Sequence, residues 1–559
     1  NVKRSTSNLL GPLHQPEVVP LDLDALEHSL GEIARDVESV AVAFLHSHRR
    51  PHHEEAVAAR LGAMGVPFVS IGSTLSPTEG YLARVRTAVV DAYLQPVIRR
   101  YLDRISASIG GRQLRVMTSA GGLVGASSYR AKDSLLSGPA GGVVGAATAA
   151  RRLDYRQIVA FDMGGTSTDV SRFDGDFEYR FEHRVGDADV AAPSLAIETV
   201  AAGGGSICRL EGRQLKVGPQ SAGASPGPAC YGAGGPLTIT DVNLLLGRLD
   251  AGRFGIPLDA GAAEARLAEQ MGHLAAAGSR LDRDELLLGY LAIADQRMAE
   301  AVRQISVRLG YDPRGYALVA FGGAGGQHAC SVAEQLGMGT VVLPPEAGLL
   351  SAFGLGAAVL ERFATRQVLR RLDEVEPEIG KWLDELGRAA RRQLEGEGVA
   401  PAASEIRRRL CFLRLVGQES SLEIEAKPDV PLEEAFLDAY AGRYGYRPRA
   451  AAIEVVSLRV VASERRPEQE PVATPSSRPV EPEEKTEVVF ADGRHRAGVF
   501  ALGELGEGAV IEGPCLVFDR HASLTVPPGW TAQVRGGALV ASGPASSGPA
   551  SSGSSRRRG

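Results

Sequence analysis

The chain has 559 residues, of which 44% are hydrophobic and 23% are charged, and its mean hydropathy is −0.05. This composition is ordinary for a water-soluble globular protein, and the length predicts about three or four domains. The net charge of −6 and the pI near 6.1 argue against binding to nucleic acid or to a membrane surface through basic charge. The five cysteines, none in a CxxC pair, argue against a disulfide scaffold or a zinc knuckle and favour a reducing cytoplasm.

Neither a membrane span nor a targeting segment is expected. No stretch reaches the roughly 18 consecutive apolar residues that a transmembrane helix needs. The longest run of small apolar residues, 141–150, is too short and too rich in Gly and Ala. Residues 1–12 lack the hydrophobic core of a signal peptide and do not begin with Met. We therefore expect a cytoplasmic protein, with a chain that is processed or is a fragment.

The first part of the sequence alternates between helix and strand signals. Apolar runs predict strands over 39–47 and 66–73, and the segment 51–65, with Pro near its start and Gly near its end, predicts a helix between them. A long helical pattern follows over 79–108, and residues 113–123 predict a strand that runs into a Gly turn. This alternation indicates an α/β fold with a largely parallel sheet.

The middle of the sequence continues the α/β pattern. Residues 136–153 predict a Gly-rich opening followed by a helix of small residues, and residues 156–175 predict strand, turn, strand. Asp282 and Glu285 suit a capping box at the start of the clearest helix, 285–309. Its apolar residues recur at spacings of three and four, on one face: Leu287, Leu291, Ala294, Met298, Val302, Ile305 and Leu309.

The last third of the sequence changes character. Residues 376–397 predict a charged amphipathic helix, and residues 407–426 predict a β-hairpin. The Pro- and Glu-rich segment 463–487 is typical of a linker or a long loop. Short strands between Gly and Pro turns over 488–541 predict a small β module, and the repetitive tail 542–559 has the composition of a disordered linker.

The segment FDMGGTSTDVS, residues 161–171, places a flexible polar turn directly after a buried strand. Its glycines can adopt φ > 0 and let the backbone approach a ligand closely, and the N–H groups of such a turn converge on an anion. We expect this turn to hold phosphate through Gly164, Gly165, Thr166, Ser167 and Thr168. Asp162 can orient Mg²⁺ or its water, and Asp169 can support the loop or the metal. A plain hairpin with glycines in its turn is the alternative.

A second glycine-rich stretch lies in VAFGGAGGQHACSVAEQLG, residues 319–337. A strand predicted over 316–323 ends there and a helix begins about five residues later, an arrangement in which the helix N-terminus favours phosphate. We expect four glycines to shape an adenosine side of the site: Gly322, Gly323, Gly325 and Gly326. His328 either contacts the ligand or caps the helix. By itself this pattern also fits a tight strand-to-helix turn.

Two further segments invite a site interpretation. Residues 198–212 carry three consecutive glycines, from which Gly204 and Gly205 are candidate substrate contacts. The long Gly/Pro loop within 218–249 ends at Asp241, which is a candidate substrate contact or the N-cap of a helix over 242–249. Three cysteines near these loops fit small buried residues better than nucleophiles, and adjacent histidines with two glutamates fit a solvated helix turn better than a metal site: Cys208, Cys230, Cys330, His52, His53, Glu54 and Glu55.

Taken together, these motifs resemble one family. The segments FDMGGTSTDVS, SGPAGGVVGA, AAGGGSI, SPGPACYGAGGPLTITDVNLLLGRL, DPRGYALVAFGGAGGQHA and VPPGW occur in this order. The set is similar to the hydantoinase A / 5-oxoprolinase / acetone carboxylase β-subunit family over residues 20 to 540. The resemblance implies an actin-like ATPase (ribonuclease H-like) fold that binds ATP between two α/β domains. It makes 161–171 the second phosphate loop and 321–329 the adenosine loop.

Within that family, AAGGGS and GGAGGQHAC resemble 5-oxoprolinase more closely than hydantoinase or carboxylase members. The implied reaction is the ATP-dependent opening of 5-oxo-L-proline to L-glutamate through phosphorylation of the amide oxygen. The resemblance implies ATP and Mg²⁺ as cofactors, a small cyclic amide as substrate, a hydantoinase B-like partner domain or subunit, and an oligomer. An ATP-dependent hydantoinase, an acetone carboxylase-type subunit and a non-catalytic actin-like nucleotide-binding subunit are the alternatives.

The sequence departs from the family pattern in three respects. A first phosphate loop, expected roughly 100 residues or more upstream, is absent, and Glu198 stands where members often carry His or Asn. A second large catalytic domain is expected beyond the tail. The implied organisation is a remainder of an N-terminal α/β domain, an ATPase domain, an α+β region, a linker, a β module and a disordered tail, over 1–135, 136–370, 371–465, 466–487, 488–541 and 542–559.

Overall fold

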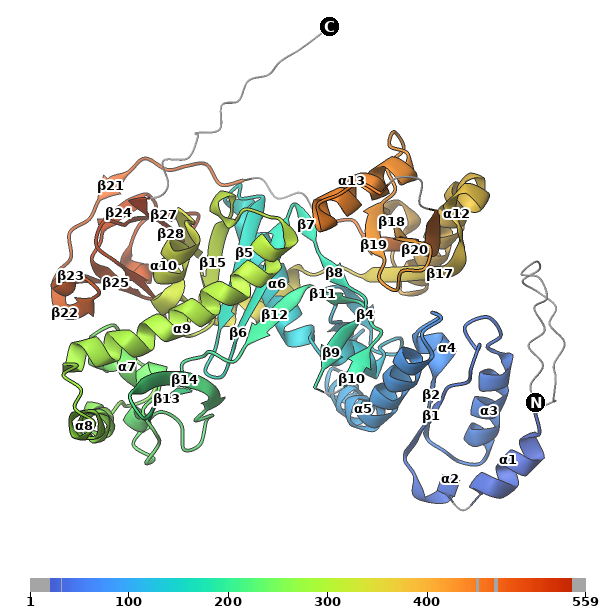
Figure 1. Ribbon diagram of the computed structural model, residues 1–559, viewed down its shortest axis with the longest axis horizontal. Helices are drawn as coiled ribbons and strands as arrows, with labels where there is room; N and C mark the ends of the chain where they lie inside the picture. The colour runs from blue at the N-terminus through green and yellow to red at the C-terminus, as the bar shows by residue number, and fades with distance from the viewer. Residues whose placement is uncertain (1–20, 32, 187, 449–451, 467–470, 545–559) are drawn as a thin grey trace, which may run out of the picture. The chain divides into compact units, whose positions relative to one another are not determined.

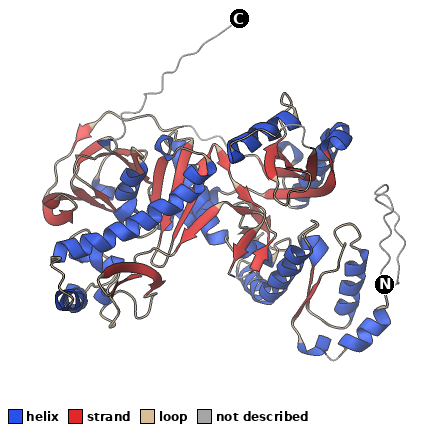
Figure 2. Cartoon of the chain, viewed as in Figure 1, coloured by secondary structure: helices blue, strands red, loops and turns tan. Residues whose placement is uncertain are grey.

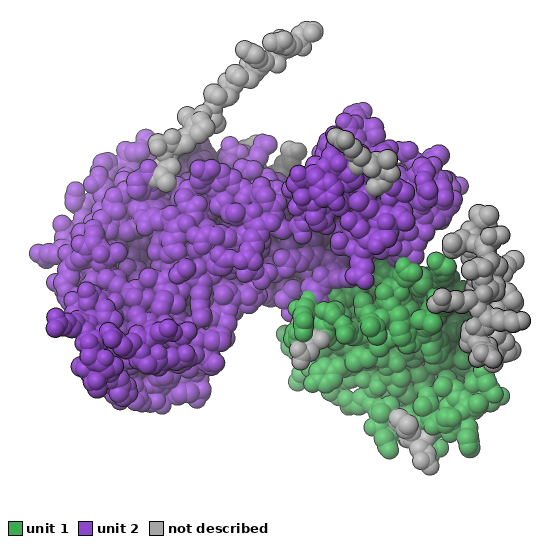
Figure 3. Space-filling view, viewed as in Figure 1, with its two compact units in different colours: residues 1–111, 130–132, 184–192 green, residues 112–129, 133–183, 193–559 purple. Residues whose placement is uncertain are grey.

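The computed structural model describes residues 21–31, 33–186, 188–448, 452–466 and 471–544. The chain divides into two compact units, which Figure 3 distinguishes by colour. Unit 1 comprises residues 1–111, 130–132 and 184–192, and unit 2 comprises residues 112–129, 133–183 and 193–559. None of the helices in the described ranges is long and apolar enough to cross a membrane.

Unit 1 contains a parallel strand pair with helices around it. Strand β1 (Ser39–Val42) pairs with β2 (Phe68–Ile71), and the connection between them contains helix α3 (His52–Ala63). Helix α5 (Tyr81–Ser108) follows β2 and contacts both strands. The predicted order of strand, helix, strand and long helix is confirmed. The short helices of this unit are α1 (Leu23–Leu30), α2 (Ile33–Asp36) and α4 (Gly72–Leu75).

The first turn of α3 differs from the solvated turn that the sequence predicts. Glu54 is fully buried, and its carboxylate accepts hydrogen bonds from the backbone N–H groups of Phe44 (2.6 Å) and Ser73 (2.8 Å). These bonds lower the pKa of Glu54 against the effect of burial. The carboxylate therefore ties the segments that follow β1 and β2 together. No cluster of three metal-ligating side chains occurs in the described part of the chain.

The core of unit 2 is a ten-stranded mixed sheet, drawn in red in Figure 2. Its central strands run in the order β12 (Ile197–Val200), β6 (Thr168–Asp174), β5 (Gln157–Met163), β15 (Ala317–Phe321) and β16 (Thr340–Leu343). β5 pairs antiparallel with β6 and parallel with β15. The predicted strand, turn, strand over 156–175 is thus confirmed as a hairpin. β5 and β15 are buried on both faces, as their continuous apolar sequences require.

Helices from different parts of the sequence pack on this sheet (Figure 1). α9 (Arg283–Ile305) lies against β6 and β12, and α10 (Gly325–Leu336) lies against β15 and contacts α9. The predicted capping box is confirmed, since Asp282 and Glu285 exchange hydrogen bonds of 2.8 Å at the start of α9. The predicted apolar face is buried up to Ile305, but Leu309 lies beyond the helix and is 39% exposed.

Helix α6 (Ser137–Arg152) already includes the glycines predicted to form an opening loop. Its glycines allow helix α11 (Leu350–Ala357) to pack closely, because a Cβ on Gly141 would lie 2.8 Å from the Ser351 carbonyl oxygen and one on Gly145 would lie 2.5 Å from that of Leu350. The prediction of a loop was wrong here because a helix of small residues and a glycine loop have the same composition.

The segment 361–464 of unit 2 forms a separate antiparallel sheet. Its strand order is β17 (Glu361–Arg371), β20 (Ile453–Glu464), β18 (Ser404–Leu415) and β19 (Leu422–Glu425). Helix α12 (Leu372–Gly396) packs on β17 and β20. The predicted amphipathic helix and the predicted hairpin over 407–426 are both confirmed. Helix α13 (Leu432–Tyr444) packs on β19.

The strands over 478–542 belong to two sheets. A four-stranded sheet contains β22 (Glu484–Phe490), β23 (Gly493–Ala501), β25 (Cys515–Phe518) and β26 (Ser523–Val526). The others join the central sheet, where β28 pairs with β16: β21 (Arg478–Pro479), β24 (Ala509–Glu512), β27 (Thr531–Arg535) and β28 (Ala538–Ser542). This arrangement places the β25–β26 hairpin near α10, which contacts β26.

The remaining elements of unit 2 flank the central sheet. Helices α7 (Ile239–Leu245) and α8 (Ala260–Ala276) pack on each other, and β13 (Ser206–Glu211) pairs with β14 (Gln214–Ser221). Strands β3 (Arg115–Met117) and β4 (Leu123–Gly125) form the strand and turn predicted over 113–123. In the predicted linker over 463–487, residues 467–470 lie outside the described residues, as do residues 545–559 of the predicted disordered tail.

Candidate functional site

Three glycine-containing loops meet at one end of the central strands. The loop 164–167 joins β5 to β6, the loop 201–205 follows β12, and the loop 322–324 joins β15 to α10. Backbone hydrogen bonds hold them together: Gly204 N–H donates to the Gly164 carbonyl (3.1 Å), Gly205 N–H to that of Gly165 (2.6 Å), and Ala324 N–H to that of Met163 (3.1 Å). The structure therefore brings together the three glycine motifs that the sequence singles out.

Close backbone contact explains why glycine is needed in these loops. A Cβ on Gly203 would lie 2.7 Å from the backbone nitrogens of both Thr166 and Ser167. Gly322 has φ +75°, and its Cβ would lie 2.5 Å from an Asp162 carboxylate oxygen. Any larger residue at either position would separate the loops or displace the carboxylate.

A cavity of about 330 Å³ opens between these loops and two other segments. Of the predicted site residues, Gly164, Gly165, Gly204 and Gly323 line it. Thr166 is exposed beside them and Ser167 is half-buried, so both remain available to a ligand. The other lining residues are 231, 240, 249, 250, 253–255, 324, 327 and 518–523.

Thr168 differs from the prediction of a phosphate-binding hydroxyl. It is fully buried, and its Oγ1 donates a hydrogen bond of 2.5 Å to the Ala202 carbonyl. Gly205 is also buried against the Gly165 carbonyl and does not line the cavity. Both residues support the glycine loops, because their polar groups already form hydrogen bonds with neighbouring backbone.

Gly325 and Gly326 form the first turn of α10 and do not line the cavity. A Cβ on Gly325 would lie 3.5 Å from the Phe161 carbonyl oxygen, which is an ordinary contact. A Cβ on Gly326, in contrast, would overlap the carbonyl oxygen of Ser523. The helix therefore starts earlier than the sequence suggests, and Gly326 lets the β25–β26 hairpin lie directly against it.

His328 neither lines the cavity nor caps α10. Its ring is fully buried, with Nδ1 2.6 Å from an Asp295 carboxylate oxygen and Nε2 3.1 Å from the Asn243 amide nitrogen. Since Asp295 lies on α9 and Asn243 on α7, the imidazole connects three helices. Both predicted roles were wrong, because a His in the first turns of a helix gives no sequence signal for its partners on other helices.

Asp241 is likewise a structural residue. The cap of α7 is Thr238, and Asp241 is the third helical residue of a capping box. Its buried carboxylate accepts hydrogen bonds from the backbone N–H groups of Ala229 (3.1 Å), Cys230 (2.7 Å) and Thr238 (2.7 Å). It therefore anchors the Gly/Pro loop on α7, and the predicted N-cap position was three residues too late.

The carboxylates of the β5–β6 hairpin have unusual electrostatics. Asp162 and Asp169 are direct partners in the strand register, and both are half-buried. Burial and the neighbouring Asp169 charge raise the pKa of Asp162 to about 6. Burial also raises the pKa of Asp169, although Thr199 Oγ1 donates it a hydrogen bond of 2.5 Å. No lysine, arginine or histidine among the described residues pairs with either one.

The cysteines do not take part in this site. All five are buried free thiols, and burial raises the pKa of each, to about 12 for Cys411 and Cys515. The sequence prediction of small buried residues is confirmed. Glu198, which departs from the family pattern, lies on β12 with a carboxylate oxygen 3.4 Å from the Arg180 guanidinium.

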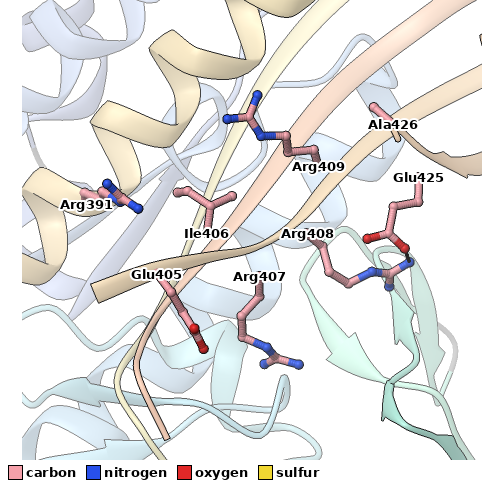
Figure 4. A pocket seen from close by; sticks show the side chains of 8 residues that line it. All are labelled: Arg391, Glu405, Ile406, Arg407, Arg408, Arg409, Glu425 and Ala426. Atoms are coloured by element: carbon pink, nitrogen blue, oxygen red, sulfur yellow. Dashed lines mark hydrogen bonds and ion pairs between the residues drawn. The ribbon is translucent and has the colours of Figure 1, made fainter. Parts of the chain in front are cut away.

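A second cavity, of about 450 Å³, lies among arginines of β18 and α12. Figure 4 shows Arg408 pointing toward Glu425 and Arg409 pointing toward the helix that carries Arg391. Arg408 lies 2.9 Å from Glu423, and Arg409 lies 2.9 Å from Asp384. Arg408 and Arg409 therefore diverge, and each lies beside a carboxylate, so the two do not form a convergent charge for a ligand.

The sequence does not identify the segments that complete the first cavity. Thr240 donates a hydrogen bond of 2.9 Å to the Gly204 carbonyl from the start of α7. Residues 249–255 follow α7, and residues 518–523 form the β25–β26 turn. Thr240 could be found from its place beside the glycine-rich motif, but the two segments carry no glycine pattern and are brought here only by the fold.

This arrangement has the chemistry of a site for an anionic ligand with a divalent cation. Glycine amides and exposed hydroxyls offer hydrogen-bond donors, and two unpaired carboxylates offer oxygen ligands to a hard cation. The helix N-terminus of α10 adds positive potential at the cavity wall. A polyphosphate accompanied by Mg²⁺ satisfies both parts.

Comparison with known proteins agrees with the resemblance seen in the sequence. The family model described as Hydantoinase/oxoprolinase matches residues 84–363, and that described as Hydantoinase/oxoprolinase N-terminal region matches residues 12–65. The chain is 34% identical over 521 residues to the 5-oxoprolinase PfmaA of Pestalotiopsis fici, an alignment that covers 89% of this chain and 40% of PfmaA. The chain thus spans less than half the length of this relative.

Two other relatives are closer in length. The caprolactamase subunit alpha of Pseudomonas jessenii is 31% identical over 554 residues, covering 92% of this chain and 77% of that protein. The crystal structure of the ATP-dependent caprolactamase from this organism has a TM-score of 0.84 at 29% identity, covering 94% of this chain and 80% of that chain. An acetone carboxylase in its nucleotide-free form has a TM-score of 0.69 at 23% identity, covering 92% and 78%, which is a likeness of fold.

Proposed function

The chain belongs to the hydantoinase/oxoprolinase family, and from this membership and the geometry of the glycine-lined cavity we propose that it binds Mg-ATP and uses it to open a cyclic amide. The proposed reaction is 5-oxo-L-proline plus ATP and two molecules of water giving L-glutamate, ADP and phosphate. The observation that carries the proposal is the meeting of three glycine loops beside two carboxylates that lack a cationic partner among the described residues.

The proposal assigns the polyphosphate to the loop 164–167. Gly165, Thr166 and Ser167 supply backbone amides and hydroxyls. Gly164, whose own N–H donates to the Ser167 carbonyl (3.1 Å), closes the loop at the cavity, and Gly204 supports it from the neighbouring loop. The loop that begins at Gly322 forms the adenosine side. A site divided into a phosphate side and an adenosine side fits an actin-like ATPase (ribonuclease H-like) domain, and we propose such a domain over residues 136–370.

Asp162 and Asp169 fit a Mg²⁺ ion, because two facing carboxylates without a counter-charge favour a hard cation with oxygen ligands. When bound, the cation would neutralise charge on the phosphates. Asp162 would orient a metal-bound water, and Asp169, fixed by Thr199, would keep the opposite strand in position. These residues position reactants and stabilise charge, which accounts for most catalysis of phosphoryl transfer.

Coupling to ATP explains how a stable amide is opened. Transfer of the terminal phosphoryl group to the amide oxygen forms an O–P bond, breaks the bond to ADP and makes the ring carbon electrophilic. Water then adds to that carbon, and the C–N bond breaks with a proton transferred to nitrogen, which leaves an acyl phosphate. A second water hydrolyses this acyl phosphate to the carboxylate and free phosphate. The substrate class rests on the relatives, because 5-oxoproline and caprolactam are both cyclic amides.

A larger lactam ring is the second candidate substrate. The alignment covers 77% of the caprolactamase subunit alpha but only 40% of PfmaA. The same comparison supports a partner, since that relative is a subunit. We propose a hydantoinase B-like domain or subunit as the partner of this chain, in an oligomeric assembly. The five buried free cysteines support a reducing compartment such as the cytoplasm.

The test is ADP release from Mg-ATP in the presence of 5-oxoproline, caprolactam or hydantoin, with the chain alone and with its hydantoinase B-like partner. We expect one cyclic amide to stimulate release and the variant Asp162→Asn to lose this stimulation. Asp429→Asn, an exposed aspartate between β19 and α13, is the matched control and should behave as wild type. Absence of stimulated release with every amide, with and without the partner, would refute the proposed reaction.

A further inference from the structure

The cavity beside the glycine loops has two chemically different walls. One part of the lining is backbone, from Gly164, Gly165 and Gly204 at the proposed phosphate side and from Gly323 at the proposed adenosine side. The rest of the lining carries three aromatic rings, a salt-bridged arginine and the turn of the β25–β26 hairpin, namely Tyr231, Phe254, Phe518, Arg253 and 519–522. Backbone amides suit phosphate, whereas flat aromatic and guanidinium groups suit a nucleobase.

The hairpin turn is fixed by direct packing against Gly348 and the first turn of α10. Asp519 N–H donates to the Ala522 carbonyl (2.8 Å) and closes the turn. A Cβ on Gly348 would overlap His521, and one on Gly326 would overlap the Ser523 carbonyl oxygen. The turn therefore has a defined place at the cavity wall, although it lies about 190 residues after the loop it covers.

Two side chains of this turn are available to a ligand. Arg520 and His521 are exposed at the cavity, and neither has a hydrogen-bond or ion-pair partner within the described ranges of the chain. Arg253 differs, because its guanidinium lies 3.0 Å from Asp250 and 2.9 Å from Glu484. An arginine held at a cavity wall without a carboxylate partner is suited to a planar or anionic group of a ligand.

The aromatic groups form the rest of this wall. The Phe254 and Tyr231 ring centroids are 6.3 Å apart, and the Arg253 guanidinium carbon lies 5.8 Å from the Phe518 ring centroid. Phe254 is half-buried in a segment whose neighbours are mostly exposed, so it projects from a short irregular connection. Such a ring is not needed for a helix or a sheet, and its position at the cavity gives it a binding role.

We infer that Phe254 and the hairpin turn Asp519–Ala522 form the nucleoside-binding wall of this site, with Phe254 stacking on the base and Arg520 contacting the nucleoside part of the ligand. This inference rests on the proposed function, since it extends the adenosine side that begins at Gly322 to further residues of the same cavity. It makes the 515–526 hairpin part of the nucleotide site.

The test compares Mg-ATP with inorganic tripolyphosphate, which has the phosphates and lacks the nucleoside. Equilibrium binding is measured for wild type, Phe254→Ala and Arg520→Ala. We expect each variant to weaken ATP binding about tenfold, as loss of one base-stacking or guanidinium contact does, and to leave tripolyphosphate binding within about twofold of wild type.

Each variant has a matched control. Ile256→Ala changes an exposed apolar residue next to Phe254 that does not line the cavity, and Arg496→Ala removes an exposed arginine on β23. Both should bind ATP as wild type does. Unchanged ATP binding in Phe254→Ala or Arg520→Ala, or equal weakening of ATP and tripolyphosphate, would overturn the inference. A wild-type protein that binds neither ligand would instead refute the proposed function.

Discussion

The electrostatics of Asp162 predict that replacing it stabilises the protein. In the folded chain its pKa is raised from 3.8 to about 6. Above pH 6 the folded state therefore carries an ionised carboxylate whose charge is less well stabilised by the protein than by water. A tenfold change in an acid constant corresponds to about 1.4 kcal/mol, so the penalty at pH 8 is about 3 kcal/mol. Asp162→Asn removes this penalty while keeping the size of the side chain.

The sign follows from proton binding. Between about pH 3.8 and 6 the folded state keeps a proton that the unfolded state has lost, so the stability of the wild type falls as pH rises through this window. Asp162→Asn lacks this dependence. Its advantage should be full at pH 8 and about half as large at pH 5.

Thermal unfolding of wild type and Asp162→Asn at both pH values measures this effect. If unit 2 melts as one, about 3 kcal/mol corresponds to a rise of about 3 °C in the melting temperature at pH 8. The same variant should lose Mg-dependent nucleotide binding, so stability and function would move in opposite directions. A variant that is less stable than wild type at pH 8, or an advantage that grows on acidification, would refute the electrostatic reasoning.

Three other experiments test separate features. Gly326→Ala should destabilise the protein by about 1–3 kcal/mol, because its Cβ would overlap the Ser523 carbonyl. The control Gly272→Ala lies on the exposed face of α8, where a Cβ meets nothing within 4 Å, and should be neutral or stabilising by up to about 1 kcal/mol. Thermal melts of both variants decide this. His328→Leu should cost about 3 kcal/mol, because it leaves the buried Asp295 carboxylate without its partner, yet nucleotide affinity measured on the folded variant should stay within twofold; a large loss of affinity would place His328 in the site. The five cysteines should react with a thiol reagent only after unfolding, and fast labelling of the native protein would contradict their burial.

Much of the fold follows from local sequence patterns. Asp282 and Glu285 mark the start of α9 correctly, and the apolar runs on either side of Gly164 and Gly165 give the β5–β6 hairpin. These signals work because capping and alternation act within a few residues. The glycines of α6 were misjudged because the reason for them is a neighbouring helix, which a local pattern does not reveal.

The candidate site was predicted unevenly for the same reason. Glycines at 164, 165, 204 and 323 line the cavity as expected, since glycine clusters signal close backbone approach. Thr168, Asp241 and His328 have the right residue types, but their polar atoms are already satisfied by backbone or by other helices. The β25–β26 turn was missed because its place depends on strands that join the central sheet near the end of the chain.

The most direct test of the central claim, that this chain binds Mg-ATP at the glycine loops, is titration calorimetry of ATP into the protein with and without Mg²⁺, for wild type and Asp162→Asn. We predict one site per chain, binding that depends on Mg²⁺, and affinity at least tenfold weaker in the variant, which is expected to be the more stable protein. Absence of binding to wild type in the presence of Mg²⁺, or binding that depends on neither Mg²⁺ nor Asp162, would contradict the account.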